Sequence, residues 1–365
     1  MKMYISKTKY HCGVDLHKSL SYICVMDREG KIYMHKAIQG NDFAYMKKIL
    51  APYWSSITIA CESTYNWYIL ADFCVEEGIE FALGHALYMK SIHGGKVKND
   101  REDSKKIADL LRINMLPFAY ACPAELRANR DLLRRRIKLI RERAGISTYM
   151  GLFEQQNGLN ESSTYMRTKI TGIEKLEEFQ NFQGPGAIAL KRNYDFNTSL
   201  LFSYVEELEK IDKDLNEMTI NSALAEEYEL VQTMPGVGKI LGMTLIYETQ
   251  DISRFESVGR YASYCRVIKC KKESAGKNYG YGGVKIGNPF LKWAFSQIAV
   301  LSKRDPFMKA YSQELEKRHG KRKARSIYTH KICRSIYFML LRRQPFDRME
   351  FFGLQKYERL QRMIS

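Results

Sequence analysis

The sequence contains no apolar run that approaches the roughly 20 residues a helix needs to cross a bilayer. Its first residues, Met1 to Lys7, are basic but lack the apolar stretch of a secretory signal peptide. These two absences argue against membrane-spanning and secreted proteins. We therefore expect a cytoplasmic protein that has no membrane partner.

The eight cysteines show little of the spacing that binds zinc. Cys265 and Cys270 lie near each other, but no second pair completes a site. Many of the others fall inside apolar runs, as Cys61 and Cys333 do. In a reducing compartment we interpret them as small buried hydrophobic residues.

Acidic residues are outnumbered, with 41 Asp and Glu against 58 Lys and Arg and a formal charge of +17. The apolar share of 45% and the aromatic share of 12% are typical of a globular protein, which argues against wholesale disorder. A chain of 365 residues has room for two or three domains. The charge has a bland interpretation, solubility, but its clustering among aromatic residues favours a polyanionic partner.

The first 115 residues alternate between strand-like and helix-like segments. A turn signal at residues 27–30 separates two β-rich runs and predicts a hairpin, and Gly78 is suited to end a helix. The predicted order is three strands, helix, strand, helix, strand and helix, at residues 10–15, 21–26, 31–38, 42–51, 57–62, 65–77, 80–85 and 100–114. This order is the ribonuclease-H-like pattern, which RuvC resolvases and many transposases share.

Four acidic residues, which we call the acidic tetrad, fall where this architecture would bring them together: Asp15, Glu62, Asp100 and Asp103. Asp15 and Glu62 end two predicted strands, and the other two share one helix face. Converging carboxylates repel each other, and Mg²⁺ (or Mn²⁺) relieves that repulsion with oxygen ligands. Two such ions about 4 Å apart would stabilise the attacking and leaving oxygens of a phosphodiester. The alternative is four independent surface acids.

A long basic helix is predicted over residues 124–156, with apolar positions at three- and four-residue spacing. We expect it to contact nucleic acid through Arg130, Arg134 and Arg135. Residues 180–191 contain Gly184-Pro185-Gly186 and are interpreted as a connection. An apolar seam over residues 201–218 predicts a helix that pairs with another; its members are Leu201, Val205, Leu208, Ile211, Leu215 and Met218.

The last third begins with a turn, residues 234–239, that resembles a helix-hairpin-helix element. Its glycines, Gly236 and Gly238, would let backbone N–H groups and Lys239 approach a phosphate, although an ordinary tight turn is the alternative. A loop rich in glycine and lysine follows at residues 269–277, and a helix follows it at 290–301. A basic stretch at 317–325 then precedes a final helix near 327–341. The cations expected to contact phosphates here are Lys271, Lys272, Lys277, Lys321, Arg322 and Lys323.

These segments together predict three parts. Residues 1–158 form an α/β RuvC-like (ribonuclease-H-like) domain that includes the long basic helix. Residues 159–228 form a helical or coiled-coil connector. Residues 229–365 form a mostly α-helical domain with the helix-hairpin-helix-like element and the loop at 269–277, which contains Ser274 and which we call the serine loop.

Over nearly its whole length the chain resembles the DEDD transposases of the insertion-sequence one-ten group, which include the Piv/MooV-type DNA invertases. Residues 13–18, 60–64 and 98–111 look like the three acidic segments of that family. Residues 234–255 are similar to the opening of its C-terminal transposase domain, and residues 274–277 with 287–294 to its serine-containing core. One departure is Arg266-Val267-Ile268-Lys269, where many members have Gly-Leu and then a proline. Because of this departure, Ser263 is an alternative to Ser274 as the nucleophilic serine that the resemblance implies.

The resemblance implies a DNA transposase or recombinase of an insertion sequence in a bacterial or archaeal cell, associated with the nucleoid. It implies that the tetrad and Ser274 form one composite active site and that a covalent serine–DNA link is made. It also implies a bridge RNA that pairs with target and donor DNA, and a homodimer or homotetramer in contact through the 201–218 seam. Two alternatives remain: a RuvC-like, metal-dependent endonuclease that resolves junctions by hydrolysis, and a nucleic-acid-binding protein without enzymatic activity.

Overall fold

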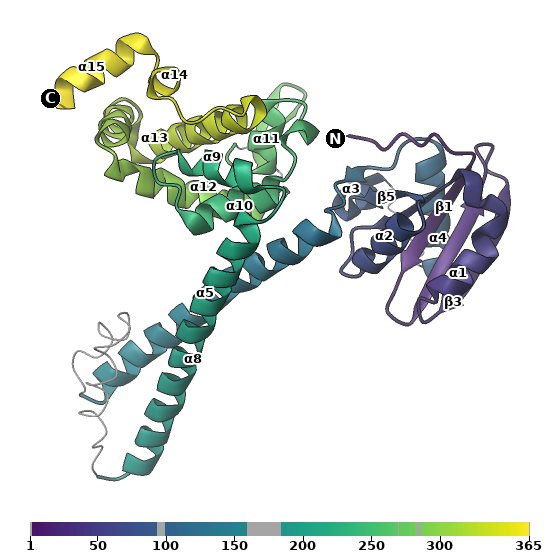
Figure 1. Cartoon of the computed structure of the whole chain (residues 1–365), viewed down its shortest axis with the longest axis horizontal. Coiled ribbons are helices and arrows are strands. Elements are labelled where there is room, and N and C mark those ends of the chain that lie inside the picture. The colour runs from purple at the N-terminus through teal and green to yellow at the C-terminus, as the bar shows by residue number, and fades with distance from the viewer. Residues whose placement is uncertain (1, 93–98, 159–183, 269, 283–285, 365) are drawn as a thin grey trace. The chain divides into compact units, whose positions relative to one another are not determined.

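The computed structural model describes residues 2–92, 99–158, 184–268, 270–282 and 286–364. The chain divides into two compact units, Met1–Glu125 and Leu126–Ser365 (Figure 1). We call them the sheet unit and the helical unit. The mixed α/β unit followed by a mostly helical region confirms the predicted fold class at this level. Within the described residues, no helix is both long and apolar enough to cross a membrane.

The sheet unit is built on six strands in the order β3-β2-β1-β4-β5-β6. β1, β4 and β5 run parallel to one another, while β2, β3 and β6 pair antiparallel with their neighbours. Four strands begin or end within two residues of the predicted positions, and β4 matches its prediction; the short β6 was not predicted. Their bounds are β1 Tyr10–Leu16, β2 Leu20–Met26, β3 Ile32–Gln39, β4 Ile57–Glu62, β5 Glu80–Gly84 and β6 Phe118–Ala119.

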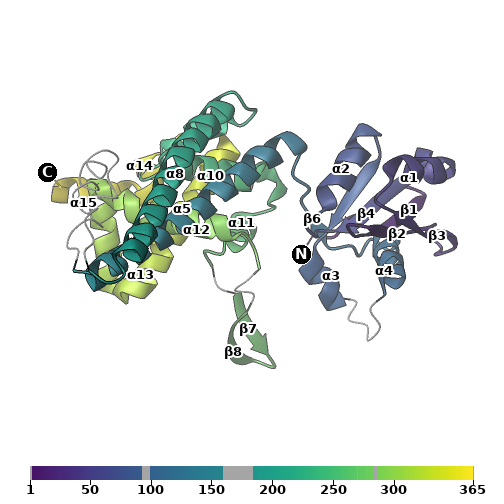
Figure 2. The same ribbon diagram turned by 90° about the horizontal axis from the view of Figure 1, so that it is seen from below.

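Helices cover both faces of this sheet (Figure 2). On one face, α1 (Phe43–Leu50) and α2 (Trp67–Glu76) pack on Val14, Ile59 and Cys61. On the other, α4 (Asp100–Arg112) packs on Ala60 and Ala82. The turn η1 (Ala51–Ser56) and helix α3 (Ala86–Ile92) complete the unit and were not predicted.

The helical unit begins with two long helices, α5 (Ala124–Gln156) and α8 (Ala187–Ile220). They lie side by side and antiparallel (Figures 1 and 2), since Tyr149 bonds Asn193 while Arg136 bonds Asp212 further along. The predicted bounds of α5 are confirmed. α8 begins at Ala187, so the predicted connection at 180–191 is wrong for its last residues because Gly186 already precedes the first helical turn.

The apolar seam of α8 pairs within the chain. Leu201, Leu208 and Leu215 are only 2%, 4% and 0% exposed. Their burial confirms the predicted pairing of helices. It argues against these three leucines as part of a contact between copies, because they have no surface left for a partner.

The remaining helices enclose the larger apolar core, which includes Tyr247, Tyr261, Phe295 and Ile332. The predicted loop at 269–277 is wrong, because residues 270–282 form a two-stranded hairpin that stands out from the helices (Figure 2). The helices and strands that follow α8 have these bounds: α9 Ala225–Gln232, α10 Lys239–Thr249, η2 Ile252–Arg254, α11 Val258–Tyr264, β7 Cys270–Ser274, β8 Lys277–Gly282, α12 Pro289–Leu301, η3 Ser302–Arg304, α13 Pro306–Arg342, α14 Arg348–Phe352 and α15 Leu354–Ile364.

The basic stretch at 317–325 lies inside α13, whereas we predicted that it precedes a helix. Gly320 breaks the helical conformation there (φ 71°, ψ 156°), and the helix resumes after it. The predicted helix at 327–341 is the second half of α13. It is not the final helix, since α14 and α15 follow.

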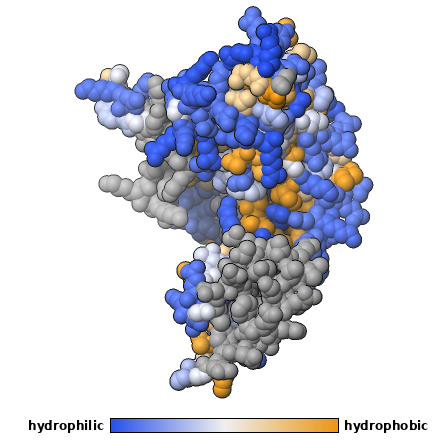
Figure 3. Space-filling view, turned by 90° about the vertical axis from the view of Figure 1, so that its left-hand side faces the viewer, coloured by the Kyte–Doolittle hydropathy of each residue, from blue (hydrophilic) through white to orange (hydrophobic). Residues whose placement is uncertain are grey.

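The unit boundary between residues 125 and 126 differs from the predicted divisions at 158 and 228. The long basic helix is counted with the helical unit because its arginines bond acidic residues there. The cysteine interpretation holds for the seven cysteines whose side chains are described, all of which are buried. Hydrophilic side chains dominate the face shown in Figure 3, with apolar patches between them.

Candidate functional site

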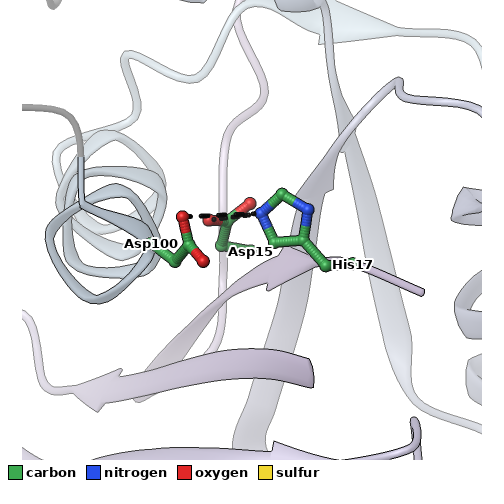
Figure 4. Close-up of side chains that lie close together, drawn as sticks. All are labelled: Asp15, His17 and Asp100. Atoms are coloured by element: carbon green, nitrogen blue, oxygen red, sulfur yellow. Dashed lines mark hydrogen bonds and ion pairs between the residues drawn. The ribbon is translucent and has the colours of Figure 1, made fainter. Parts of the chain in front are cut away.

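Three side chains of the sheet unit come close enough to share one metal ion: Asp15, His17 and Asp100 (Figure 4). One ligand atom from each lies within 4.8 Å of the others. The imidazole Nε2 of His17 is 3.3 Å from Asp15 Oδ2 and 3.7 Å from Asp100 Oδ1. Among the described residues, this is the group of metal-binding side chains that the geometry brings together.

The alternation of side chains along β1 aims Asp15 at this place. Val14 faces the core under α1 and α2, so Gly13 and Asp15 face α4. Val14 is paired with Cys61 in the parallel neighbour β4, so Asp15 and Glu62 end adjacent strands at the carboxyl edge of the sheet.

The close approach of α4 to the sheet depends on Gly13. A Cβ at this position would lie 2.2 Å from the carbonyl oxygen of Ser104 and 2.4 Å from the amide nitrogen of Ala108. Only glycine permits this contact, because a methyl group would push the helix away from β1. Asn99 accepts a hydrogen bond from the Arg101 amide and caps the helix, so Asp100 begins α4 beside the end of β1.

The electrostatics of the site favour a cation. Burial raises the pKa of Asp15, and the charges of Asp100 and Asp103 raise it further, while His17 acts in the opposite direction. Asp103 has a cation of its own, since Lys106 Nζ lies 2.8 Å from its Oδ1. Within the part of the chain that the structure describes, negative charge thus accumulates around Asp15 without a lysine or arginine that pairs with it.

The structure therefore brings together two members of the acidic tetrad, Asp15 and Asp100, and adds His17, which sequence reasoning missed as a site residue. Glu62 and Asp103 are outside the close group. The signal that would have found His17 is its spacing from Asp15, because residues two apart at a strand end share a face. The donor set fits a divalent cation: carboxylates suit Mg²⁺ or Mn²⁺, and an imidazole ligand favours the transition metal of the two.

The arginines predicted to contact nucleic acid on α5 are mostly engaged by the chain itself. The guanidinium of Arg134 donates two hydrogen bonds to Glu248, at 2.6 and 2.7 Å, and lies over the ring of Phe290. Arg130 has only 12% of its side chain exposed and lies 3.4 Å from Asp131. Arg135 is 53% exposed and 3.8 Å from Glu142, so it alone of the three has most of its side chain open to a ligand.

The predicted helix-hairpin-helix glycines have different surroundings. Gly236 has φ 85°, and a Cβ there would lie 2.4 Å from the Ser302 amide nitrogen. Its need for glycine is thus explained by the chain's own backbone, which matches the alternative of an ordinary tight turn. Gly238 has nothing within 4 Å of its Cβ position, and it and Lys239 are exposed at the start of α10.

Ser274 is the last residue of β7 and is paired with Lys277 across the hairpin turn. Ala275 and Gly276 form that turn with φ values of 48° and 72°, as a two-residue hairpin of this type requires. The side chains of Ser274, Lys271 and Lys272 lie outside the described part of the structure, whereas Lys277 is exposed. Ser263 lies in α11, as expected for the alternative serine.

The segment that leaves the hairpin is fixed by Asn288. Its side-chain amide donates to Glu248 Oε2 at 2.7 Å, and its Oδ1 accepts from the Phe290 and Leu291 amides at the start of α12. Its backbone amide donates to the carbonyl of Tyr264 in α11 at 2.6 Å. The exposed cations Lys321, Arg322 and Lys323 lie elsewhere, just after the break in α13.

Two family models match the chain. One, for DEDD transposases of the IS110 type and described simply as transposase, covers residues 12–150. The other, described as the transposase IS116/IS110/IS902 family, covers residues 228–313. Together they span more than half of the chain. The chain is also similar to the transposase for insertion sequence element IS1111A of Coxiella burnetii (strain RSA 493 / Nine Mile phase I), with 22% identity over 283 residues, 77% of this chain and 74% of that protein.

These matches define the class: the protein is a transposase, an enzyme that acts on DNA. The chain belongs to the IS110-type family of DEDD transposases, which confirms the resemblance found in its sequence. The first model includes all four members of the acidic tetrad, and the second includes Ser263 and Ser274.

Proposed function

We propose that this protein moves an insertion sequence by cutting and rejoining DNA in a metal-dependent reaction that passes through a serine–DNA covalent intermediate. The observation that carries the proposal is the group of Asp15, His17 and Asp100 at the carboxyl edge of the sheet. The strand order, with an antiparallel hairpin beside parallel β1, β4 and β5, supports a ribonuclease-H-like, RuvC-like fold.

In this proposal the acidic tetrad holds Mg²⁺ or Mn²⁺. Asp15 and Asp100 are the nearest ligands, and Glu62 and Asp103 complete the site from β4 and α4. When bound, the metal supplies charge stabilisation to the phosphodiester that is cut. His17 orients the Asp15 carboxylate, since its imidazole Nε2 lies 3.3 Å from Asp15 Oδ2.

Ser274 supplies the nucleophile. Its Oγ forms a bond to phosphorus while the bond from phosphorus to one DNA ester oxygen breaks, and the released strand leaves with a hydroxyl end that takes the proton from the serine. The phosphoserine ester conserves the energy of the phosphodiester, so a hydroxyl end can attack it and release the serine. Its place beside an exposed two-residue turn supports this role, because a hairpin end can reach into DNA.

Three further features belong to the proposal. A bridge RNA pairs with target and donor DNA, and the exposed cations Lys321, Arg322 and Lys323 support contact with such a polyanion. The active enzyme is a homodimer or homotetramer that uses a surface other than the buried seam of α8. Function is divided among the parts 1–158, 159–228 and 229–365.

The test is a suicide substrate that carries a nick beside the cleavage site. We expect wild-type protein and Ser263→Ala to form a covalent adduct with the DNA, and Ser274→Ala to form none. Asp15→Asn should abolish both cleavage and adduct. Strand exchange at the full rate by Ser274→Ala would exclude the serine mechanism.

A second candidate is a RuvC-like endonuclease that resolves DNA junctions by hydrolysis. The observation in its favour is that the metal-binding group is assembled within the sheet unit alone. It predicts metal-dependent cleavage that Asp15→Asn abolishes and Ser274→Ala leaves intact, with no adduct. The same suicide substrate therefore separates the two candidates.

A further inference from the structure

A basic pocket of about 250 Å³ opens in the helical unit, where the second half of α13 meets the segment that leads into α14. Its walls combine cations with aromatic rings, and the residues that matter here are Lys331, Arg334, Phe338, Arg342, Glu350 and Phe351. None of these belongs to the acidic tetrad, to the basic stretch at 317–325 or to the β7–β8 hairpin that carries Ser274, which we call the serine hairpin.

Within the part of the chain that the structure describes, two of the three cations in this pocket have no anionic partner. Among the described residues, no carboxylate lies within ion-pair distance of Lys331 Nζ or of the Arg334 guanidinium, although Lys331 is partly buried. The third cation, Arg342, lies 2.9 Å from Glu350. Most neighbouring arginines are neutralised in the same way: Arg343 lies 3.4 Å from Glu226, and Arg348 lies 2.6 Å from Asp305.

Aromatic rings hold these cations in place. Lys331 Nζ lies 4.9 Å from the ring centre of Tyr311 and 5.1 Å from that of Phe351. Arg334 and Arg342 lie 5.1 Å and 4.8 Å from the ring centre of Phe338. Rings attract cations but do not neutralise their charge, so the pocket retains a positive field that is fixed before any ligand arrives.

The cations of this pocket repel one another, which destabilises the protein when no ligand is bound. Burial lowers the pKa of Lys331, and the nearby charges of Lys356 and Arg334 lower it further. Of these two neighbours, Lys356 has a counter-ion, since it lies 3.2 Å from Glu314. An anion placed between Lys331 and Arg334 would remove the repulsion, so the pocket favours an anionic ligand.

We propose that this pocket binds a phosphodiester group of a nucleic-acid strand, with Lys331 and Arg334 contacting the phosphate oxygens. At about 250 Å³ the pocket has room for a phosphate group. The pocket is also lined by Asp347 and by Glu350, which pairs with Arg342, so the free cations that it offers to a phosphate are Lys331 and Arg334. The exposed guanidinium planes offer a surface on which a base can stack. The inference needs only a protein that acts on nucleic acid, not the serine mechanism.

The test compares two arginine substitutions that remove the same charge from the same helix end. Arg334→Ala removes a cation of the pocket, whereas Arg343→Ala removes an exposed cation that pairs with Glu226 and Glu227 instead. The full-length protein is titrated with duplex DNA, single-stranded DNA and structured RNA over a range of salt concentrations. Thermal melting of each variant checks that it is folded.

We expect Arg334→Ala to weaken binding and to reduce the slope of log K against log salt by about 0.9 for duplex DNA or about 0.7 for a single strand. Arg343→Ala should leave the slope unchanged. The nucleic acid that shows the change identifies whether the phosphate comes from DNA or RNA. Lys331→Gln should act in the same direction as Arg334→Ala.

Equal effects of Arg334→Ala and Arg343→Ala on every probe would overturn the proposal, since net charge alone would then explain them. An unchanged slope for Arg334→Ala would overturn it as well. Neither result depends on adduct formation by Ser274. Failure of the pocket and failure of the proposed function are therefore distinguishable.

Discussion

Two carboxylates of this protein, the half-buried Asp15 in the sheet unit and the buried Glu248 in the helical unit, have opposite surroundings. Glu248 is 1% exposed and accepts two hydrogen bonds from Arg134 and one from Asn288. Asp15 has Asp100 and Asp103 nearby, and His17 partly offsets their charge. The difference separates a charge that stabilises the fold from a charge that is left for a ligand.

Glu248 also helps to position the serine hairpin, through its hydrogen bond with Asn288. Glu248 lies in α10, and through Asn288 it fixes the point where the chain leaves the hairpin and enters α12. Arg134 brings α5 into the same network and lies over Phe290. A buried bidentate pair of this kind gives orientation more than net stability, because desolvation offsets much of the attraction.

The largest loss of stability is expected from breaking the buried ion pair between Arg134 and Glu248. Arg134→Met leaves Glu248 buried with one donor, Asn288, and should destabilise the helical unit by about 3 kcal/mol. Because the chain has two units, a single unfolding curve is not a safe measure. Hydrogen exchange of the backbone amides in α10 and α12 reports the loss locally.

Arg135→Met is the matched control, since Arg135 neighbours Arg134 in sequence but is 53% exposed and 3.8 Å from its acidic neighbour. It should change the opening free energy by less than about 0.5 kcal/mol. Similar exchange rates in the two variants would show that Glu248 does not depend on Arg134. The contrast with Asp15 would then have no basis.

A smaller loss of stability is expected from moving Asp100 away from Asp15, whose negative charges have no such partner among the described residues. Gly13→Ala places a methyl group against the backbone of Ser104 and Ala108 and should push α4 away from β1. We expect a loss of about 1–3 kcal/mol in the stability of the sheet unit, as for other overpacked cores. Exchange of the β1 and α4 amides measures it, and the response of the protein to Mg²⁺ should weaken as Asp100 moves from Asp15.

Gly145→Ala is the control for this change. Gly145 lies on α5, and its Cβ position has nothing within 4 Å. Alanine should therefore stabilise the helix, by about 0.5–1 kcal/mol, through its higher helix propensity. If Gly13→Ala were as harmless, the close contact between α4 and β1 would not be what holds the carboxylates together.

The strands and the acidic positions were accessible to sequence reasoning because local patterns determine them. The apolar runs that end at Asp15 and Glu62 predict strands, and the Asp100–Asp103 spacing predicts a shared helix face. His17 was missed because its proximity to Asp100 depends on α4 packing over Gly13, a contact between distant parts of the chain. Arg134 was misjudged for the same reason. Its sequence neighbours suggest a cation that is free to bind nucleic acid, but in the folded protein it contacts Glu248, which is distant in sequence.

The loop at 269–277 and the role of the α8 seam were misjudged for related reasons. Glycine and lysine near Ser274 suggested irregular structure, but Ala275-Gly276 provides the positive φ values of a hairpin turn. The seam leucines were correctly seen as a pairing surface. A single sequence does not show whether the partner helix belongs to the same chain, and here α5 fills that place.

The smallest effect tests the comparison between Asp15 and Glu248 most directly, because it asks whether the Asp15 carboxylate binds a metal ion. Its pKa is raised in the folded protein, so the stability it contributes is present at pH below the ordinary value of 3.8 and is lost as pH rises through the folded pKa. Asp15→Asn cannot ionise. Hydrogen exchange of the β1 and α4 amides should therefore report a more stable sheet unit in Asp15→Asn than in wild type at pH 7 in EDTA, and this advantage should disappear on acidification.

Added Mg²⁺ or Mn²⁺ should reverse the order of the two proteins. A concentration tenfold above the dissociation constant stabilises the wild type by about 1.4 kcal/mol, and Asp15→Asn should gain much less. Asp109→Asn is the control, since Asp109 lies on α4 but is paired with Arg112 at 2.7 Å and should keep the full response to metal. If Asp15→Asn gained nothing in EDTA and kept the metal response, Asp15 would be a structural carboxylate like Glu248, and the metal would have to be held elsewhere.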